Sequence, residues 1–310
     1  MADSSADYIH QFSFTMPENL IELFYRLAAS GCLPRQFFVR EAPKPQELPA
    51  RTGDLMLEIV SHCWQYASLL VYQLSSLALY PPTAAKVRMT VFYSKEDQQT
   101  VEALNFFSNF SPSNVLWNWS SLKTPQLLRR AIGRNAAALS TKADWVWFTD
   151  CDQVFRQGCL DDLAAQLQGR NDLLLYPRVV NCGFLPAEND NSQQIAAGAP
   201  ALKDINPGHF IPVIHTRAIG PLQITHGDAA RKLGYCKQTA LYQRPARRTW
   251  RKLHEDRVFR WLLGTPGKPV EVCNLYRIEH RTKGRDASKP THKVLRQIRQ
   301  WARQYRQCRR

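Results

Sequence analysis

Two aspartates, one residue apart, follow a run of apolar residues in the middle of the chain. The segment 144–152 reads Asp-Trp-Val-Trp-Phe-Thr-Asp-Cys-Asp. Alternate side chains of a strand point the same way, so an extended backbone would place Asp150 and Asp152 on one face and turn Cys151 away. Two close carboxylates repel each other, and in apolar surroundings this repulsion favours a compensating cation. We therefore predict that the pair holds a divalent metal ion, with a phosphate group on the far side of the metal.

The flanking sequence predicts the elements that position this pair. From Leu55 onward, β-like apolar runs alternate with helical patterns. Such alternation predicts an α/β fold with a largely parallel sheet covered by helices, in which ligands bind at the C-terminal ends of strands. The acidic pair lies at such an end. We expect strands at 55–61, 87–93, 115–119, 145–149, 173–176, 222–226 and 270–278, and helices at 18–29, 64–80, 98–107, 125–140, 160–167 and 253–263, with loops over 182–208.

The composition is that of a folded globular chain. With 310 residues, 44% of them hydrophobic and 22% charged, the chain can form one large α/β core plus appendages. The eight cysteines never form a Cys-x-x-Cys pair and no signal peptide precedes them, so we expect reduced thiols in a cytosolic protein. The longest largely apolar stretch, 67–80, is interrupted by Gln73, Ser75 and Ser76 and is shorter than the roughly 20 residues that span a bilayer, so a core helix is expected there.

The positive charge is concentrated near the C-terminus. The whole chain has a net charge of +15, but residues 231–310 contain 23 Lys and Arg against 5 Asp and Glu. The remaining residues contain 18 basic and 21 acidic side chains, a net charge of −3. This asymmetry indicates an anionic partner, either a membrane surface, a nucleic acid or an anionic ligand in a cleft.

The last twenty residues, 291–310, are predicted to form a basic amphipathic helix. Val294, Ile298, Trp301 and Tyr305 fall on one helical stripe, and arginines flank it. Such a helix can lie at an anionic membrane surface, where lipid-linked acceptors are found, or it can pack on the protein itself or on a partner subunit. Arg-rich segments also attract nucleic acid, but no reading module accompanies this one, so nucleic-acid binding is the least favoured of the three.

Four motifs, taken in order, resemble those of the inverting family 2 glycosyltransferases of the GT-A fold. They are Lys95-Glu96-Asp97 after a strand, Arg134-Asn135-Ala136, Asp150-Cys151-Asp152, and Glu255-Asp256 at the start of a helix. The resemblance covers roughly 55–285. It implies a GT-A (Rossmann-like) nucleotide-diphospho-sugar transferase fold over 51–290, preceded by a helical and linker extension at 1–50.

The resemblance also implies a metal site. Asp152 would ligate Mn²⁺ or Mg²⁺ that bridges the diphosphate of the donor, and Asp150 would hold the ribose or join the metal through water. His280, which follows the last predicted strand, would complete the metal shell, because a neutral imidazole is a suitable ligand for Mn²⁺. The alternative for His280 is a histidine in a solvated basic loop.

The remaining roles concern the donor and the acceptor. By the same resemblance, Asp97 would accept a hydrogen bond from the nucleoside base, and Arg134 would approach the base or the phosphates. Asp256 would be the general base that removes the proton of the acceptor hydroxyl. Each residue also has a structural explanation: Asp97 as a helix N-cap, Arg134 as an ordinary helix residue, and Asp256 as an acid at the positive end of a helix dipole.

The implied function is the transfer of a sugar from a nucleoside-diphosphate sugar to a saccharide or lipid-linked acceptor. It would serve cell-surface glycan synthesis in the cytoplasm, at the inner face of the membrane. Two departures from the family matter: the first strand ends in Ser61-His62-Cys63-Trp64 in place of a Pro-x-Tyr-Asn-like turn, and the basic aromatic run at 247–250 precedes Glu255-Asp256 instead of following it. The second departure favours single transfers over processive synthesis.

Other functions fit the same residues. The segment 150–154 also matches the nucleophile motif of haloacid dehalogenase-like phosphatases, in which Asp150 would be phosphorylated and Asp152 would act as acid and base. That motif normally opens its domain, and no later Gly-Asp-x-x-x-Asp supplies further metal carboxylates. A nucleotidyltransferase is a second enzyme alternative, and a basic membrane- or nucleic-acid-binding protein is the alternative that is not an enzyme.

Overall fold

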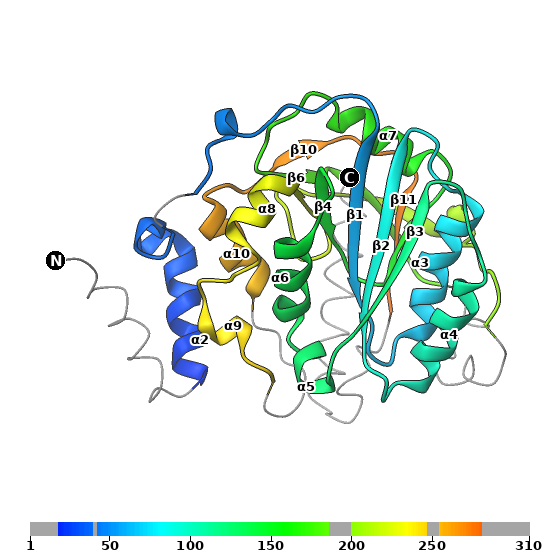
Figure 1. The fold of residues 1–310 in the computed structure, drawn as a ribbon, viewed down its shortest axis with the longest axis horizontal. Coiled ribbons are helices and arrows are strands. Elements are labelled where there is room, and N and C mark those ends of the chain that lie inside the picture. Colours follow the sequence, from blue (N-terminus) through cyan, green and yellow to red (C-terminus); the bar gives the residue numbers. More distant parts are fainter. Residues whose placement is uncertain (1–17, 40–41, 186–199, 247–253, 281–310) are drawn as a thin grey trace, which may run out of the picture. The chain divides into compact units, whose positions relative to one another are not determined.

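A seven-stranded mixed sheet is the centre of the structure (Figure 1). The computed structural model describes residues 18–39, 42–185, 200–246 and 254–280. The strand order is β10-β6-β9-β4-β1-β2-β3, in which β9 is antiparallel to both of its neighbours and the other strands run parallel to one another. The predicted α/β class, a mixed and mostly parallel sheet flanked by helices, is confirmed, and its assignment to the GT-A fold stays a prediction. The strands are β1 Leu55–His62, β2 Ala85–Tyr93, β3 Val115–Ser121, β4 Trp145–Phe148, β6 Leu174–Pro177, β9 Gln223–His226 and β10 Lys268–Val270.

A second, four-stranded sheet has the order β5-β11-β7-β8. Its strands are β5 Gln153–Phe155, β7 Val179–Gly183, β8 Phe210–Ile214 and β11 Leu275–Ile278. β11 runs antiparallel to β5 and parallel to β7. The chain passes from β4 of the large sheet to β5 of the small sheet through residues 149–152, so the Asp-Cys-Asp motif is the connection between the two sheets.

Helices cover both faces of the large sheet. Their bounds are α2 Glu18–Leu27, α3 Ala67–Leu79, α4 Gln98–Ser108, α5 Thr124–Leu127, α6 Arg130–Ser140, α7 Cys159–Leu167, α8 Gly227–Leu233, α9 Ala240–Gln243 and α10 Glu255–Leu263, with the short helical turns η1 Ala28–Cys32, η2 Arg35–Phe37, η3 Pro45–Glu47 and η6 Pro207–His209. On one face the Phe148 ring contacts Tyr235 at 4.9 Å and Phe259 of α10 at 5.9 Å. On the other face the ring of Trp147 lies 5.2 Å from that of Phe155 in the small sheet.

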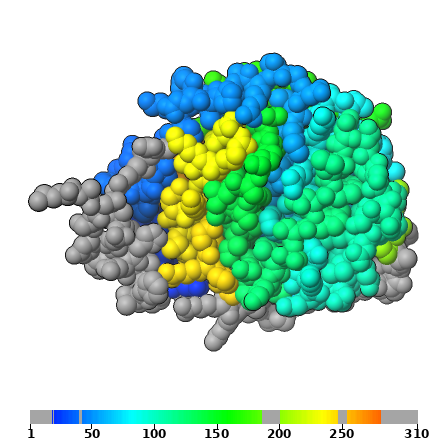
Figure 2. Space-filling model, in the orientation of Figure 1, coloured from blue at the N-terminus to red at the C-terminus, as the bar shows by residue number. Residues whose placement is uncertain are grey.

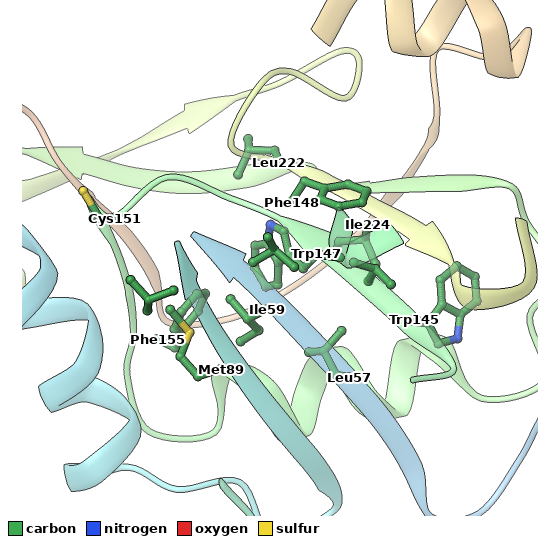
Figure 3. Packing of buried hydrophobic residues seen from close by; sticks show 14 of the residues in the cluster. Leu57, Ile59, Met89, Trp145, Trp147, Phe148, Cys151, Phe155, Leu222 and Ile224 are labelled. Carbon is green, nitrogen blue, oxygen red and sulfur yellow. The ribbon is translucent and has the colours of Figure 1, made fainter. Parts of the chain in front are cut away.

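The central strand β4 is buried on both faces. Trp145, Trp147 and Phe148 are each at most 1% exposed, and Figure 3 shows Trp147 close to Ile59 and Phe155, inside the cluster of buried side chains. Buried side chains of this size each contribute about 1.5–3 kcal/mol through removal of apolar surface from water. The indole N–H of Trp147 is satisfied because it donates to Pro221 O at 3.0 Å. This packing fixes the strand whose end carries the acidic pair.

Helices α6, α8 and α9 lie against one another on one side of the large sheet. In Figure 2 the yellow surface of α8 and α9 adjoins the green surface of α5 and α6. Hydrogen bonds join the segment that contains α8 and α9 to the segment that contains α5 and α6: Tyr235 N donates to Asn135 Oδ1 at 3.0 Å, and Ala246 N donates to Pro125 O at 2.7 Å. The segment after β9 is therefore held next to the helix that carries Arg134.

Several boundaries differ from those expected. The single strand predicted at 270–278 is wrong, because a turn with Asn274 at a φ of 51° separates β10, in the large sheet, from β11, in the small sheet. The helix predicted at 125–140 is interrupted between α5 and α6, where Leu128 and Arg129 lie outside both helices. The predicted loop 182–208 begins inside β7. The predicted helix at 291–310 lies outside the described residues.

None of the helices in the described ranges is long and apolar enough to cross a membrane. The helix expected in the core at 67–80 is α3, and most of its residues are buried. The chain divides into two units, Met1–Glu279 and His280–Arg310. Everything described below, apart from His280, belongs to the first unit.

Gly133 allows α6 to approach the end of β1. A β-carbon at this position would overlap His62 Nε2 and lie 2.9 Å from Phe92 Cγ. Alanine in a helix interior normally stabilises by about 0.5–1 kcal/mol relative to glycine, whereas overpacking costs about 1–3 kcal/mol. We expect Gly133→Ala to lower the free energy of unfolding by about 1–2 kcal/mol in urea denaturation.

The matched control is Gly220→Ala, because nothing lies within 4 Å of a β-carbon added there. This variant is expected to stay within about 0.5 kcal/mol of the wild type. A Gly133→Ala protein as stable as this control would contradict the tight contact between α6 and β1.

Candidate active site

The candidate site lies where β1 and β4 end and β5 begins. Because β1 and β4 are parallel neighbours, their C-terminal ends meet at one edge of the sheet. His62 ends β1, and Asp150 and Asp152 follow β4 in the connection to β5. The N-terminal part of α6 supplies Arg130 and Arg134, which are one helical turn apart and share a face of the helix. This edge therefore combines two carboxylates with two guanidinium groups.

Asp150 is held by both arginines. Its Oδ1 accepts from Arg130 Nη1 at 2.7 Å and from Arg134 Nη2 at 3.3 Å. Burial alone would raise the pKa of Asp150, but the positive charges of Arg130 and Arg134 outweigh it and lower that pKa to about 2. Both contacts use Oδ1, and no described residue forms a hydrogen bond with Oδ2, so this oxygen is able to bind a ligand.

Asp152 has the opposite electrostatic environment. Its Oδ1 is buried and has no hydrogen-bond partner among the described residues. Burial, and next the negative charge of Asp150, raise the pKa of Asp152 to about 7, although Arg277 acts against this. A buried carboxylate oxygen without a donor is costly for the folded protein. Asp152 is therefore the group in this site that would gain most from a cation.

The site residues fit a metal that is shared with a substrate. The described residues contain no cluster of three or more His, Cys, Asp or Glu side chains that could hold a metal ion. Mg²⁺ is usually bound by one or two carboxylates together with substrate phosphates, not by a complete protein cage. Asp150 and Asp152 match that smaller ligand set. Metal binding itself is untested and stays a prediction.

Arg134 is fully buried, with an exposed fraction of 0%. Besides Asp150, it donates to Thr149 O at 3.1 Å and to Tyr235 Oη at 2.9 Å. Tyr235 Oη in turn donates to Gln223 Oε1 at 2.8 Å. The structure thus brings the predicted residues Arg134 and Asp150 into direct contact, and the predicted contact of Arg134 with a donor remains a prediction.

Asp256 is joined to this network through its backbone. Gln223 Nε2 donates to Asp256 O at 3.3 Å, and the Asp256 carboxylate accepts from Arg260 Nη1 at 3.4 Å. Its side chain is 27% exposed, so an acceptor could reach it. Its neighbour Glu255 is more deeply buried and accepts from Arg130 Nε at 3.1 Å. The role of Asp256 as a base stays a prediction.

Asp97 lies at the end of the loop that follows β2. It is the N-cap of α4: Oδ1 accepts from Thr100 N at 3.3 Å, and Oδ2 accepts from Thr100 Oγ1 at 2.7 Å and from Gln65 N at 2.5 Å. Gln65 has a φ of 59°, which non-glycine residues rarely adopt, so Asp97 holds the loop after β1 in an unusual conformation. Asp97 thus shapes the loop beside the site, and its contact with a nucleoside base stays a prediction.

His280 is the first residue of the second unit, 280–310, so it is not placed relative to the carboxylates. Its role as a metal ligand therefore stays a prediction. The basic aromatic run at 247–250 lies outside the described residues.

Sequence reasoning missed several residues of this site. Arg130 precedes Arg134 by four positions, so the two side chains share a face of any helix that contains both. The predicted helix began at residue 125, however, and gave no reason to select Arg130. Glu255 was identified from the sequence only as the residue before Asp256, without a role of its own. Nothing in the local sequence marks Tyr235 or Gln223 as site residues, because only the fold brings Tyr235 to Arg134 and Gln223 to Tyr235.

His62, to which we assign no role from the sequence, lies within this cluster of charges. Its ring stacks on that of Phe92 at 5.0 Å, and neither ring nitrogen has a hydrogen-bond partner among the described residues. Burial, followed by the charges of Arg134 and Arg130, lowers the pKa of His62 well below 6.5. The imidazole is therefore neutral at pH 7 and adds no positive charge beside the arginines.

Comparison with known proteins adds a likeness in fold. No protein-family model matches the chain, and no curated protein matches its sequence. Among solved structures, the chain is similar to residues 1–349 of TarS from S. aureus, with a TM-score of 0.44 and 13% sequence identity. The match covers 72% of this chain and 60% of the TarS chain. At this level the likeness concerns the arrangement of the elements, and no functional statement rests on it.

The repulsion between the two aspartates can be tested by titration without metal. We expect Asp150→Asn to lower the pKa of Asp152, because it removes a like charge, while burial keeps that pKa above its ordinary value of 3.8. The measurement is a ¹³C carboxyl NMR titration of the metal-free protein. An unchanged or higher pKa of Asp152 would contradict this account.

The raised pKa of Asp152 also affects the stability of the folded protein. Between about pH 4, where an aspartate of the unfolded chain titrates, and pH 7, the folded protein holds a proton that the unfolded chain has released. The contribution of Asp152 to the free energy of unfolding therefore falls as the pH rises through this window. Asp152→Asn is expected to remove this fall in urea denaturation measured from pH 4 to pH 7, and Asp54→Asn, at an exposed aspartate before β1, serves as the control.

Proposed function

We propose that the protein is a metal-dependent inverting glycosyltransferase that moves a sugar from a nucleoside-diphosphate sugar to a hydroxyl acceptor. The observation that carries the proposal is the Asp152 carboxylate, with its buried and unpartnered Oδ1, beside Asp150 at the C-terminal edge of a mostly parallel sheet. Open α/β sheets bind ligands at this edge. A carboxylate oxygen that lacks a donor there suits a hard divalent cation.

Each of the two carboxylates would supply one oxygen atom to the site that holds the donor. The positive charges of Arg130 and Arg134 lower the pKa of Asp150, so this carboxylate is ionised at neutral pH and its Oδ2 is available as a ligand atom. Asp152 Oδ1 would supply the second oxygen, and the donor phosphates would supply others. When bound, Mn²⁺ or Mg²⁺ would neutralise charge on the departing nucleoside diphosphate. Asp97 and Arg134 are proposed to support binding of the base and the phosphates.

Asp256 is proposed as the general base. It would take the proton of the acceptor hydroxyl as the hydroxyl oxygen attacks the anomeric carbon on the face opposite the leaving group. The new glycosidic bond would form while the bond between the anomeric carbon and the β-phosphate oxygen breaks, so the configuration inverts. The partial exposure of Asp256 and the bond from Gln223 to its backbone support this role, because the side chain is accessible and the backbone is joined to the network that includes Asp150.

The acceptor is proposed to be a saccharide or a lipid-linked hydroxyl, used in the synthesis of a cell-surface glycan. With a lipid-linked acceptor, the enzyme would act at the inner face of the membrane. A thermal-shift panel of UDP-, GDP- and dTDP-sugars, each with and without Mn²⁺, would identify the donor.

Asp152→Asn is expected to abolish the Mn²⁺-dependent part of donor binding, because it removes the unpartnered anionic oxygen. The measurement is titration calorimetry with the donor found in the panel, at pH 7.5, with and without Mn²⁺. Arg231→Lys, at the other end of the sheet, should bind the donor as the wild type does. Wild-type protein that takes up no nucleotide sugar under any metal condition would remove the basis of the proposal.

Asp256→Asn is expected to bind the donor normally and to lower kcat of transfer by about 10²–10⁴-fold, the usual contribution of a general base. Initial rates of nucleoside-diphosphate release in the presence of acceptor, combined with donor affinity from calorimetry, measure the two effects separately. Unchanged turnover in this variant would show that another group takes the proton.

A further inference from the structure

Arg130 lies between two carboxylates that come from different parts of the fold. Its Nη1 donates to Asp150 Oδ1 at 2.7 Å, and its Nε donates to Glu255 Oε1 at 3.1 Å. Asp150 follows the central strand β4, whereas Glu255 is the first residue of α10. One side chain of α6 therefore joins the end of β4 to the start of the helix that carries Asp256.

We propose that Arg130 is a positioning residue that fixes the first turn of α10 relative to the Asp150 carboxylate. The contact itself is a property of the fold. Its purpose, to align the general base with the carboxylates that hold the donor, rests on the proposed function. Arg130 would act through Asp150 and Glu255, without touching the reacting atoms.

The burial of Glu255 makes this contact strong. The Glu255 side chain is 7% exposed, and the Arg130 side chain is 25% exposed. A carboxylate this deeply buried is strongly destabilising when its cationic partner is removed. The first turn of α10 is therefore held at the place where Arg130 can reach it.

The start of α10 is held by contacts that come from different parts of the fold. His254, immediately before the helix, has a left-handed backbone with a φ of 55°, which non-glycine residues rarely adopt. Farther along, Phe259 stacks on Tyr235 with ring centroids 4.2 Å apart, which holds the body of the helix. At the first turn, Gln223 bonds the backbone of Asp256, Cys236 Sγ donates to Glu255 O at 3.5 Å, and Arg257 Nε donates to Ala29 O at 3.4 Å. The bond from Arg130 to Glu255 is the one that joins this turn directly to the side chain that bonds Asp150.

The arrangement depends on arginine, not simply on a positive charge. A guanidinium group is planar and presents separate N–H groups in a fixed geometry, so Nη1 and Nε can bond two carboxylates at once. A lysine ammonium is a point charge on a flexible stem. Arg130→Lys thus keeps the charge and loses the simultaneous contact.

The first test uses the full chain without ligand. We expect Arg130→Lys and Glu255→Gln each to raise amide hydrogen exchange at residues 255–258 by about tenfold or more, which reports local opening of the first turn. The matched control is Arg231→Lys. Arg231 is also a partly buried arginine that bonds a carboxylate, Asp228, and two backbone carbonyl oxygens, but it lies away from α10. Exchange at 255–258 that matches this control in both variants would overturn the proposal.

The second test separates positioning from stability. Glu255→Gln removes the negative charge that pairs Arg130 with α10 and leaves Asp150 unchanged, so it should lower kcat by about tenfold or more while the Kd for donor and Mn²⁺ stays within about threefold of the wild type. Arg130→Lys should lower kcat and also weaken donor binding, because it disturbs Asp150. Glu255→Gln also serves if Arg130→Lys fails to fold. Raised exchange with unchanged kcat would overturn the positioning role.

The two proposals fail in different ways. If the wild type shows neither nucleotide-sugar binding nor transfer, the proposed function fails. Raised exchange at 255–258 in Glu255→Gln would then still support the contact through Arg130. If the wild type transfers sugar and the two variants behave as the control, the positioning role fails alone.

Discussion

Two carboxylates that follow one buried strand must be compensated inside the protein, and the site is built around this requirement. Asp150 is compensated by two guanidinium groups of α6, whereas Asp152 is buried beside a like charge with an oxygen that no described residue bonds. The pKa values of the two groups are therefore driven apart, to about 2 and about 7. Environments that separate paired carboxylates in this way are typical of functional sites. Here the separation identifies Asp152 as the carboxylate that lacks a partner.

The hydrogen bonds around this pair depend on the order of the strands. Because β9 runs antiparallel between β4 and β6, Gln223 pairs directly with Phe148, two residues before Asp150. From that position Gln223 bonds both Tyr235 and the backbone of Asp256. Segments that are far apart in the sequence thus meet at one edge of the sheet. A different position of β9 would leave Tyr235 without its bond to Gln223.

Elements with a hydrophobic pattern that extends over many residues were predicted from the sequence, whereas features that depend on a single tertiary contact were missed. The strands at 55–62, 85–93 and 145–148 were found because their apolar side chains form long runs. β5 and β10 have three residues each, which is too short for a period of two to appear. Arg134, Asp150 and Asp152 were selected by their motifs, and two of them are in contact. Arg130 was missed because the break before α6 hides where the helix begins, and Tyr235 because its partner is 101 residues away.

The Asp-Cys-Asp segment is also a mechanical link. Asp150 follows a strand of the large sheet, and Asp152 precedes a strand of the small sheet. Any sliding of one sheet against the other changes the separation of the two carboxylates. A ligand that binds both carboxylates would therefore join the end of a strand in the large sheet to the start of a strand in the small sheet and would restrict this sliding.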